Sequence, residues 1–296
     1  VYEGLTEYFG DVLTARSGLI TQEQYREALA ISSAVLDHRV GRSWRPLQDT
    51  ADEAQILYYS PGSWQSWRRS TDFYSEGELL WLDVDTQLRE LSGGQHSMND
   101  FGRLFYGMDN GSYVTKTYTF DDVVATLNQV QPYDWAGFLH ARLDSTAPAA
   151  PLDGIRRGGY ELSYTDTPSE FFKDYQKRRR IMNEMYSIGF SVDMEGARRG
   201  RIADVQWDGP AAKAGIAPAM ELVAVNGRAL SADPDHILQN AIREAQHSKQ
   251  PIKLLMREQD RYFECSVDYH GGLKYPQLVR VTGTPALLND ITAPLK

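Results

Sequence analysis

Glu3 and Glu7 lie in the opening run V-Y-E-G-L-T-E-Y-F-G, at a spacing that suits metal chemistry. Residues four apart on a helix share one face. At this spacing one carboxylate can bind a metal ion while the other orients a neighbouring ligand. A carboxylate in the first turn of a helix is also stabilised by the helix dipole without any ligand. Spacing alone therefore leaves two interpretations open, a metal ligand or a solvated helix start, and favours the second.

Tyr74 is the next candidate, in the run D-F-Y-S-E-G-E-L-L-W-L-D that opens a long predicted helix. Hydrolysis of a peptide bond needs a hydrogen-bond donor for the oxyanion that develops on the carbonyl oxygen. A tyrosine hydroxyl fixed at a helix start can supply that donor. The alternative is an ordinary core aromatic side chain, so this residue needs further support before a role is assigned.

Histidine is the usual partner of a carboxylate at a catalytic zinc, which takes three protein ligands. No histidine begins an H-E-x-x-H motif, and no two of them lie three or four residues apart. We therefore expect that this chain cannot complete a zinc site alone. The histidines are His38, His96, His140, His236, His247 and His270.

Composition narrows the function classes. The chain has 296 residues, 42% apolar and 24% charged, which is typical of a soluble globular protein with room for two domains. The net charge of −9 argues against nucleic acid as a partner, and we interpret the basic run 177–180 as a solvated face. No stretch is apolar enough to span a bilayer. The single Cys265 excludes an internal disulfide and a cysteine-based metal cluster, and we interpret it as a buried thiol.

Residues 1–145 show helical patterns with recognisable start and stop signals. A first helix ends near Gly18, and Thr21 caps a second helix. Residues 41–70 are aromatic-rich and interrupted by proline and glycine, so we expect irregular structure there. A long helix is expected over 71–91. Shorter helices are expected at 97–106, from 119, and at 132–143.

The pattern changes after the proline-containing linker at 145–151. Short alternating segments then predict strands. The expected strands lie at 159–164, 188–194, 200–207, 220–225, 251–257 and 261–269, with helical pieces at 211–214 and 235–246.

The opening run resembles the segment that supplies the third zinc ligand in the glycyl aminopeptidase family (metallopeptidase family sixty-one), whose members are gluzincins. The run around Tyr74 resembles the family's Y-x-E-G helix start and is similar to the Y-E-K-G segment of aminopeptidase N-like enzymes. The resemblance implies that Glu3 is a metal ligand and that Glu7 is a second carboxylate that accepts a hydrogen bond from a zinc-bound histidine. It also implies that the hydroxyl of Tyr74 assists catalysis.

Further stretches are similar to the family. They are S-G-G-Q-H-S-M-N-D-F at 92–101, G-G-L-K-Y-P at 271–276 and the tail at 283–294. The resemblance implies a zinc metallo-aminopeptidase that removes small N-terminal residues (Gly or Ala) from peptide substrates. The two histidine ligands would come from an upstream segment that this chain lacks, so the missing N-terminal half is an expected partner. We predict that the fragment alone is inactive and binds zinc weakly. We also predict that the first helix and the helix at 71–91 each expose a face for that half.

A second module follows the helical part. Ser187-Ile188-Gly189-Phe190 resembles the carboxylate-binding loop of PDZ domains, and 209–216 with 221–227 resemble the PDZ pattern of bacterial proteases. Backbone N–H groups of Ile188, Gly189 and Phe190 would hold a peptide C-terminus, and the strand after them would offer an edge for β-augmentation. The alternative is a packing module that binds no free peptide. A non-catalytic PDZ-containing adaptor is the corresponding alternative function.

Together these patterns predict a multidomain chain of α plus β class. We expect an all-helical C-terminal subdomain of a thermolysin-like zincin, then a PDZ-type β-sandwich with two helices. The resemblance and the protease-like PDZ pattern imply a bacterial periplasmic or envelope location. The expected boundaries are 1–145 for the helical half, 146–186 for the connection, 187–270 for the PDZ domain and 271–296 for the tail.

Overall fold

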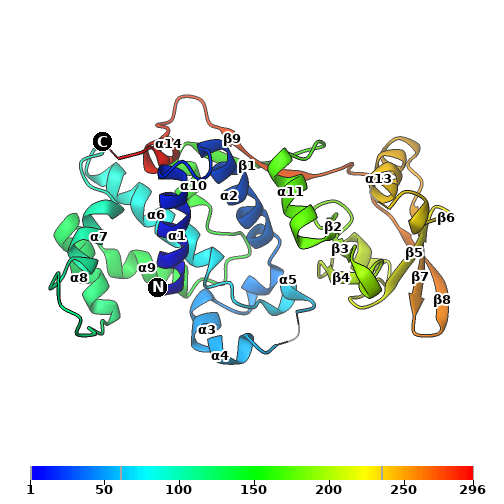
Figure 1. Ribbon diagram of the computed structural model, residues 1–296, viewed down its shortest axis with the longest axis horizontal. Helices are drawn as coiled ribbons and strands as arrows, with labels where there is room; N and C mark the ends of the chain where they lie inside the picture. The colour runs from blue at the N-terminus through cyan, green and yellow to red at the C-terminus, as the bar shows by residue number, and fades with distance from the viewer. Residues whose placement is uncertain (1, 61, 235, 296) are drawn as a thin grey trace.

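Figure 1 shows the computed structural model, in which a helical part lies beside a part built from small sheets. The structure describes residues 2–60, 62–234 and 236–295. Both ends of the chain lie in the helical part (Figure 1). This part contains α1 (Tyr2–Arg16), α2 (Gln22–Asp37), η1 (Val40–Ser43), α3 (Leu47–Asp52), α4 (Ala54–Leu57), α5 (Gln65–Arg68), α6 (Ser75–Leu91), α7 (Met98–Tyr106), α8 (Phe120–Val130), α9 (Trp135–Leu143) and α10 (Asp153–Arg157).

The rest of the chain alternates short strands and helices. Its elements are β1 (Tyr160–Thr165), α11 (Glu170–Arg179), β2 (Ile181–Asn183), β3 (Phe190–Asp193), η2 (Gly196–Arg198), β4 (Ile202–Val205), α12 (Pro210–Lys213), β5 (Glu221–Val225), β6 (Arg228–Ala229), η3 (Leu230–Ala232), α13 (Ile237–Ser248), β7 (Ile252–Glu258), β8 (Arg261–Val267), β9 (Tyr275–Arg280) and α14 (Leu287–Thr292). Val1 of the opening run and Asp235, where a helix was expected to begin, lie outside the described residues.

Local capping fixes several helix starts where the sequence predicts them. The hydroxyl of Thr21 accepts a hydrogen bond from the backbone N–H of Gln24 at 3.1 Å, and the side chain of Gln24 accepts one in return from the Thr21 N–H at 2.9 Å. Ser97 and Asp100 form the same reciprocal capping box at the start of α7. These bonds satisfy backbone donors that a helix start otherwise leaves unpaired.

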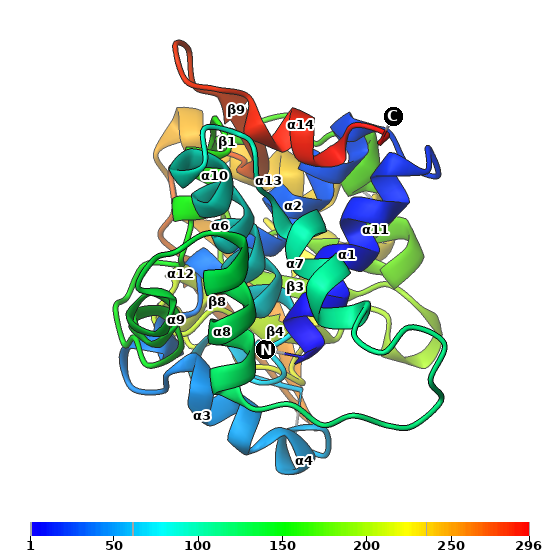
Figure 2. The ribbon, with the colours of Figure 1, turned by 90° about the vertical axis from the view of Figure 1, so that its left-hand side faces the viewer.

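Helix α6 forms the centre of the helical part. Every residue from Glu76 to Leu88 is buried, because α1, α10 and α7 pack around the helix. Figure 2 shows α7 and α8 in front of α6. The expectation that this helix exposes a face for a missing half is therefore wrong. Helix α1 does expose apolar side chains, among them Tyr2 and Leu13.

The sheets are small and antiparallel. One pairs β1 with β9, another has the order β2-β3-β4, and the largest has the order β6-β5-β7-β8. Helices with small antiparallel sheets confirm the mixed α and β class. Strands β2 and β9 were not predicted from the sequence. The PDZ-type assignment and the domain boundaries stay predictions.

Two hydrophobic cores hold these elements together. The first lies around Trp81 in the helical part and includes Leu288 and Ile291 of α14, so the end of the chain packs back onto the beginning. The second lies between the sheets and α13, and Ile31 and Ala34 of α2 contribute to it. Helix α2 thus joins the two cores. Among the described residues, no helix has the length and apolar character needed to cross a membrane.

Candidate functional site

The closest contact between α1 and α6 occurs where a glycine of each helix meets the other. A Cβ atom built on Gly4 would lie 2.4 Å from the Cα atom of Gly77, and one built on Gly77 would lie 2.7 Å from the Cα atom of Gly4. No other residue type fits this crossing without moving a backbone. The crossing brings Glu3, which precedes Gly4, beside the first turn of α6.

Tyr74 stands at the N-terminal end of α6, and its side chain is partly buried against the first core. Its hydroxyl bonds to the hydroxyl of Tyr58 and contacts the carboxylate of Glu3. The Tyr58 hydrogen bond, burial and the negative charge of Glu3 all raise the pKa of Tyr74 above its ordinary value. At neutral pH the hydroxyl carries its proton, as tyrosine ordinarily does, and can act as a hydrogen-bond donor. We call Glu3 and Tyr74 the Glu–Tyr pair.

A line of carboxyl groups continues from Glu3 along α1. Burial, with the charges of Asp11 and Glu3, raises the pKa of Glu7. One turn further on, Asp11 forms a side-chain hydrogen bond with the buried Glu78 of α6, and burial raises the pKa of both carboxyl groups. Because two carboxylates that are ionised together repel one another, the hydrogen-bonded Asp11–Glu78 pair holds a proton between its carboxyl groups.

A buried ionic network fixes the start of α6. The carboxylate of Glu76 contacts both Arg42 and Arg69, and the Nε atom of Arg69 lies 2.9 Å from Asp72. Glu76, Arg42 and Arg69 are at most 2% exposed. Glu76 is therefore engaged by two guanidinium groups and is not available to a ligand. The network holds the backbone on both sides of Tyr74.

This site can supply one of the three protein ligands that a catalytic zinc ion takes. Glu3 presents a partly exposed carboxylate, an oxygen ligand that zinc accepts. Within 2–60, 62–234 and 236–295, no group of three or more His, Cys, Asp or Glu side chains is arranged to hold a metal ion. Glu3 can therefore serve as one ligand of a site whose other ligands lie elsewhere.

A largely apolar cavity of about 240 Å³ lies next to Phe73, the neighbour of Tyr74 in the chain, although neither Glu3 nor Tyr74 lines it. Phe73, whose ring lies 4.9 Å from that of Tyr74, forms part of its wall. Tyr118 forms another part, and burial, together with the charges of Tyr2 and Glu3, raises its pKa. An apolar group of a ligand could occupy this cavity. The other lining residues are Leu47, Gln48, Ala51, Gly77, Leu80, Trp81, Thr119, Phe120, Val123 and Leu143.

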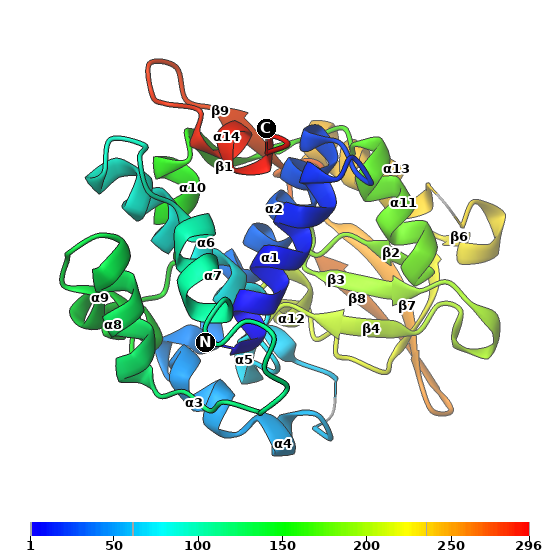
Figure 3. The ribbon, with the colours of Figure 1, turned by 60° about the vertical axis from the view of Figure 1, so that its left-hand side comes forward.

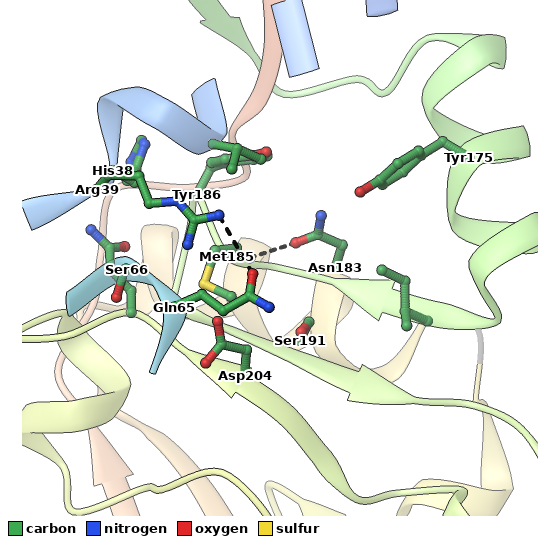
Figure 4. Close-up of a pocket in the computed structure, with 13 residues that line it drawn as sticks. His38, Arg39, Gln65, Ser66, Tyr175, Asn183, Met185, Tyr186, Ser191 and Asp204 are labelled. Carbon is green, nitrogen blue, oxygen red and sulfur yellow. Dashed lines mark hydrogen bonds between the residues drawn. The ribbon is translucent and has the colours of Figure 1, made fainter. Parts of the chain in front are cut away.

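A second cavity, of about 160 Å³, lies between the two parts of the chain. Figure 4 shows Arg39, from the link between α2 and η1, on one side and Asn183 and Asp204, from the strands, on the other. An Asp204 carboxylate oxygen accepts the backbone N–H of Trp64 at 2.7 Å. Its lining includes neither residue of the Glu–Tyr pair. This cavity therefore offers no obvious part of the hydrolytic chemistry.

The loop at 187–190 precedes β3, as the sequence predicts. Ile188 and Phe190 are buried in the second core, and Gly189 has a φ of 91°, which glycine adopts readily. Strand β3 is paired on both of its edges, with β2 and with β4. The roles predicted for Ile188, Gly189 and Phe190 in binding a peptide stay predictions.

The sequence gives no indication of the contacts made by two further residues, Tyr58 and Glu184. Tyr58 lies in the irregular aromatic stretch, where its position gives no indication of a contact with Tyr74. Glu184 is 1% exposed in the second part, yet in the sequence it is one acidic residue among many. Both depend on contacts between distant segments. The structure does bring together Glu3 and Tyr74, the two residues singled out for chemistry.

Comparison with known proteins identifies the family that the start of the chain resembles. A family model described as M61 glycyl aminopeptidase matches residues 1–80, the segment that contains the Glu–Tyr pair. The match confirms the resemblance drawn from the sequence. No curated protein matches the chain.

Among solved structures, the chain is similar to an aminopeptidase N family protein from Idiomarina loihiensis, with a TM-score of 0.70 and 16% sequence identity. The alignment covers 99% of this chain and 48% of that one. At this identity the likeness establishes the fold alone. The chain spans about half the length of that protein.

Proposed function

We propose that this chain, whose first 80 residues match the glycyl aminopeptidase family, is the C-terminal portion of a zinc-dependent aminopeptidase. In this proposal Glu3 is a metal ligand and Tyr74 is a hydrogen-bond donor at the reacting carbonyl. The observation that carries the proposal is the contact between the carboxylate of Glu3, on α1, and the hydroxyl of Tyr74, which directly precedes α6.

The residues divide the work of peptide hydrolysis between them. A zinc ion bound at Glu3 would supply a Lewis acid that polarises the peptide carbonyl and activates water. Tyr74 is protonated at neutral pH, as tyrosine ordinarily is, so its hydroxyl can donate a hydrogen bond to the oxyanion that forms. Glu7 would accept a hydrogen bond from a histidine ligand and fix the orientation of its ring.

A complete zinc site needs two protein ligands in addition to Glu3. We propose that two histidines of an H-E-x-x-H segment outside these residues complete the zinc site, in agreement with the resemblance. Substrates would be peptides with a small N-terminal residue such as Gly or Ala. In this proposal the 296-residue chain alone has no peptidase activity and binds zinc weakly, because it supplies a single ligand.

The test compares single variants of the full-length protein, which includes the H-E-x-x-H segment. Glu3→Ala is expected to lose both bound zinc and cleavage of glycyl substrates. Tyr74→Phe is expected to keep zinc and lose about 10²- to 10³-fold in kcat, the usual effect of removing one oxyanion donor. Zinc content and steady-state kinetics on glycyl anilides measure both effects.

Tyr25→Phe is the matched control. The Tyr25 hydroxyl is buried in the same core and has no hydrogen-bond partner in the structure, so its removal should leave kcat and zinc content unchanged. A Tyr74→Phe variant as active as the wild type would remove the tyrosine from the mechanism. Full zinc content in Glu3→Ala would remove Glu3 from the metal site.

A further inference from the structure

The second part of the chain contains a strand whose edge is filled by a neighbouring segment. Strand β3 lies between β4 and β2, and Figure 3 shows β3 and β4 side by side, with β2 next to α11. Strand β2 runs antiparallel to β3, with Met182 opposite Val192 and Asn183 opposite Ser191. The chain direction of β2 therefore leads toward the loop at 187–189.

The loop amides at the end of β2 are engaged by a single residue. The backbone carbonyl of Glu184 accepts hydrogen bonds from the N–H groups of Ser187 and Gly189, both at 3.1 Å. Its own N–H donates to the carbonyl of Phe190 at 3.1 Å, which extends the β2–β3 ladder by one residue. In the structure, two amides of this loop are thus already paired with Glu184.

The side chain of Glu184 is also buried and hydrogen-bonded. It is 1% exposed, and its carboxyl group accepts hydrogen bonds from the Gln239 side chain of α13 at 2.7 Å and the Ser187 hydroxyl at 3.3 Å. The Tyr275 hydroxyl lies 3.4 Å away. Burial raises the pKa of Glu184 to about 7. A carboxyl group is therefore lodged between the loop and α13.

The side chains of the segment alternate as those of a bound strand do. Met182 is 5% exposed and belongs to the second core, on the same side as the carboxyl group of Glu184. Asn183 and Ile181 instead line the cavity between the two parts of the chain. Within segment 181–184, the side chains of Met182 and Glu184 thus lie between β3 and α13.

These contacts have the form of peptide capture by strand addition. In that mode an extended peptide pairs with an exposed strand edge, alternate side chains enter pockets, and backbone amides bind its terminal carboxylate. Here the direction, the alternation and the position of Glu184 at the loop all match, but the occupant belongs to the same chain.

We propose that segment 181–184 is an internal ligand of a peptide groove formed by β3, the loop at 187–189 and α13. The groove binds a free peptide C-terminus only when this segment is released. This inference does not depend on the proposed peptidase function, because it concerns residues outside the Glu–Tyr pair.

Release of the segment is structurally reasonable. Strand β2 is three residues long and lies at the edge of its sheet. Arg180, which joins it to α11, has a φ of 53° in the left-handed region. The Gln176 side chain of α11 accepts the Asn183 N–H at 2.7 Å and fastens the strand from outside the groove. A change at Gln176 can therefore loosen the segment without altering the groove.

The experiment measures binding of a fluorescent peptide, Arg-Ile-Met-Asn-Glu with a free C-terminal carboxylate, to three versions of the chain. Gln176→Ala removes the outer fastening, and Met182→Pro removes a backbone donor of β2. Since the apparent affinity scales with the fraction of open groove, we expect each variant to bind at least about tenfold more tightly than the wild type. The amidated peptide should bind no variant.

Asp174→Ala is the matched control, since Asp174 lies on the same helix and is exposed. It should behave as the wild type does. Hydrogen exchange at the amide of Gly189 checks each variant: exchange should be faster in the opened variants and slower again with the acid peptide. Met182→Pro is used only if its circular dichroism matches the wild type, and Gln176→Ala carries the test otherwise.

Three results would overturn the proposal. The first is equal binding of the acid peptide to the wild type and to the opened variants, since the groove would then be free from the start. The second is equal binding of the acid and the amide. The third is the absence of binding to a folded Gln176→Ala variant whose Gly189 amide exchanges faster than in the wild type.

Discussion

Glu3 and Glu184 are two carboxylates at points where separate elements meet, and their surroundings differ in kind. Glu3 is partly exposed and contacts the hydroxyl of Tyr74. Glu184 is 1% exposed and has hydrogen-bond donors from Gln239, Ser187 and Tyr275. A carboxylate with free coordination can accept a metal ion, whereas one whose oxygens are already satisfied acts as a structural ligand.

The frameworks around the two carboxylates differ as well. Glu3 sits on a long helix whose backbone touches that of α6 at Gly4 and Gly77, and Glu76 anchors the start of α6 in an ionic network. Glu184 sits in a short turn after the three-residue strand β2. The framework around Glu3 is a close helix crossing anchored by ion pairs, and it leaves the carboxylate partly exposed. The framework around Glu184 is a short turn, and its carboxyl group is buried.

The largest effect should come from breaking the network that holds Tyr74. Glu76→Ala leaves Arg42 buried without its partner and Arg69 with Asp72 alone. Loss of one member of a buried ionic cluster costs about 3–5 kcal/mol in the free energy of unfolding. Urea unfolding of the 296-residue chain measures this cost.

Asp49→Ala is the control for that prediction. Its pair with Arg45 lies at the surface, with the Asp49 side chain 47% exposed, so its loss should cost less than about 1 kcal/mol. A Glu76→Ala variant as stable as the control would mean that the network does not hold the start of α6.

The crossing of α1 and α6 should show a smaller effect of the same kind. In Gly77→Ala the new methyl group would lie 2.7 Å from the Cα atom of Gly4, so the helices must separate. Overpacking of this kind costs about 3 kcal/mol. In the full-length protein the shift should also move Glu3 away from Tyr74 and weaken zinc binding, which metal analysis after dialysis measures.

Gly10→Ala supplies the contrast on the same helix. A Cβ atom at Gly10 meets nothing within 4 Å, so alanine should raise stability by up to about 1 kcal/mol through its helix propensity. If both alanines proved equally harmless, the close approach of the two helices would not be what positions Glu3.

The parts of this structure that depend on neighbouring residues were predictable from the sequence. The helix starts at Thr21 and Ser97 appear at the expected positions, because the donors and acceptors of their caps lie within three residues. The strands of the β7–β8 hairpin were also expected, since alternation is a local signal. The importance of Glu3 and Tyr74 was recognised from family resemblance, whereas spacing alone favoured a solvated helix start for Glu3.

The parts that depend on distant segments were not predictable. Strand β9 pairs with β1 across more than a hundred residues, and nothing in the local pattern identifies that partner. Burial of Glu184 requires Gln239 and Tyr275, which come from two other elements. The same holds for α6, which was expected to expose a face for a missing half. Its carboxylates instead pair in the interior with Arg42, Arg69 and Arg142.

The smallest expected effect is a pH dependence of stability, which tests whether the carboxyl group of Glu184 is buried. Burial raises its pKa from 4.5 to about 7, so between these values the folded chain holds a proton that the unfolded chain has lost. The free energy of unfolding therefore falls as the pH rises through this window. The shift corresponds to at most about 3 kcal/mol, and we expect about 2 kcal/mol after the neighbouring donors relax.

Glu184→Gln removes the titrating group and nearly preserves its shape, so the stability of this variant should fall less between pH 4.5 and 7 than that of the wild type. Urea unfolding at several pH values in this window measures the difference. Glu161→Gln, at an exposed position of β1, should keep the wild-type profile. Parallel profiles for Glu184→Gln and the wild type would mean that Glu184 reaches solvent as Glu3 does. The contrast between an open and a closed carboxylate would then disappear.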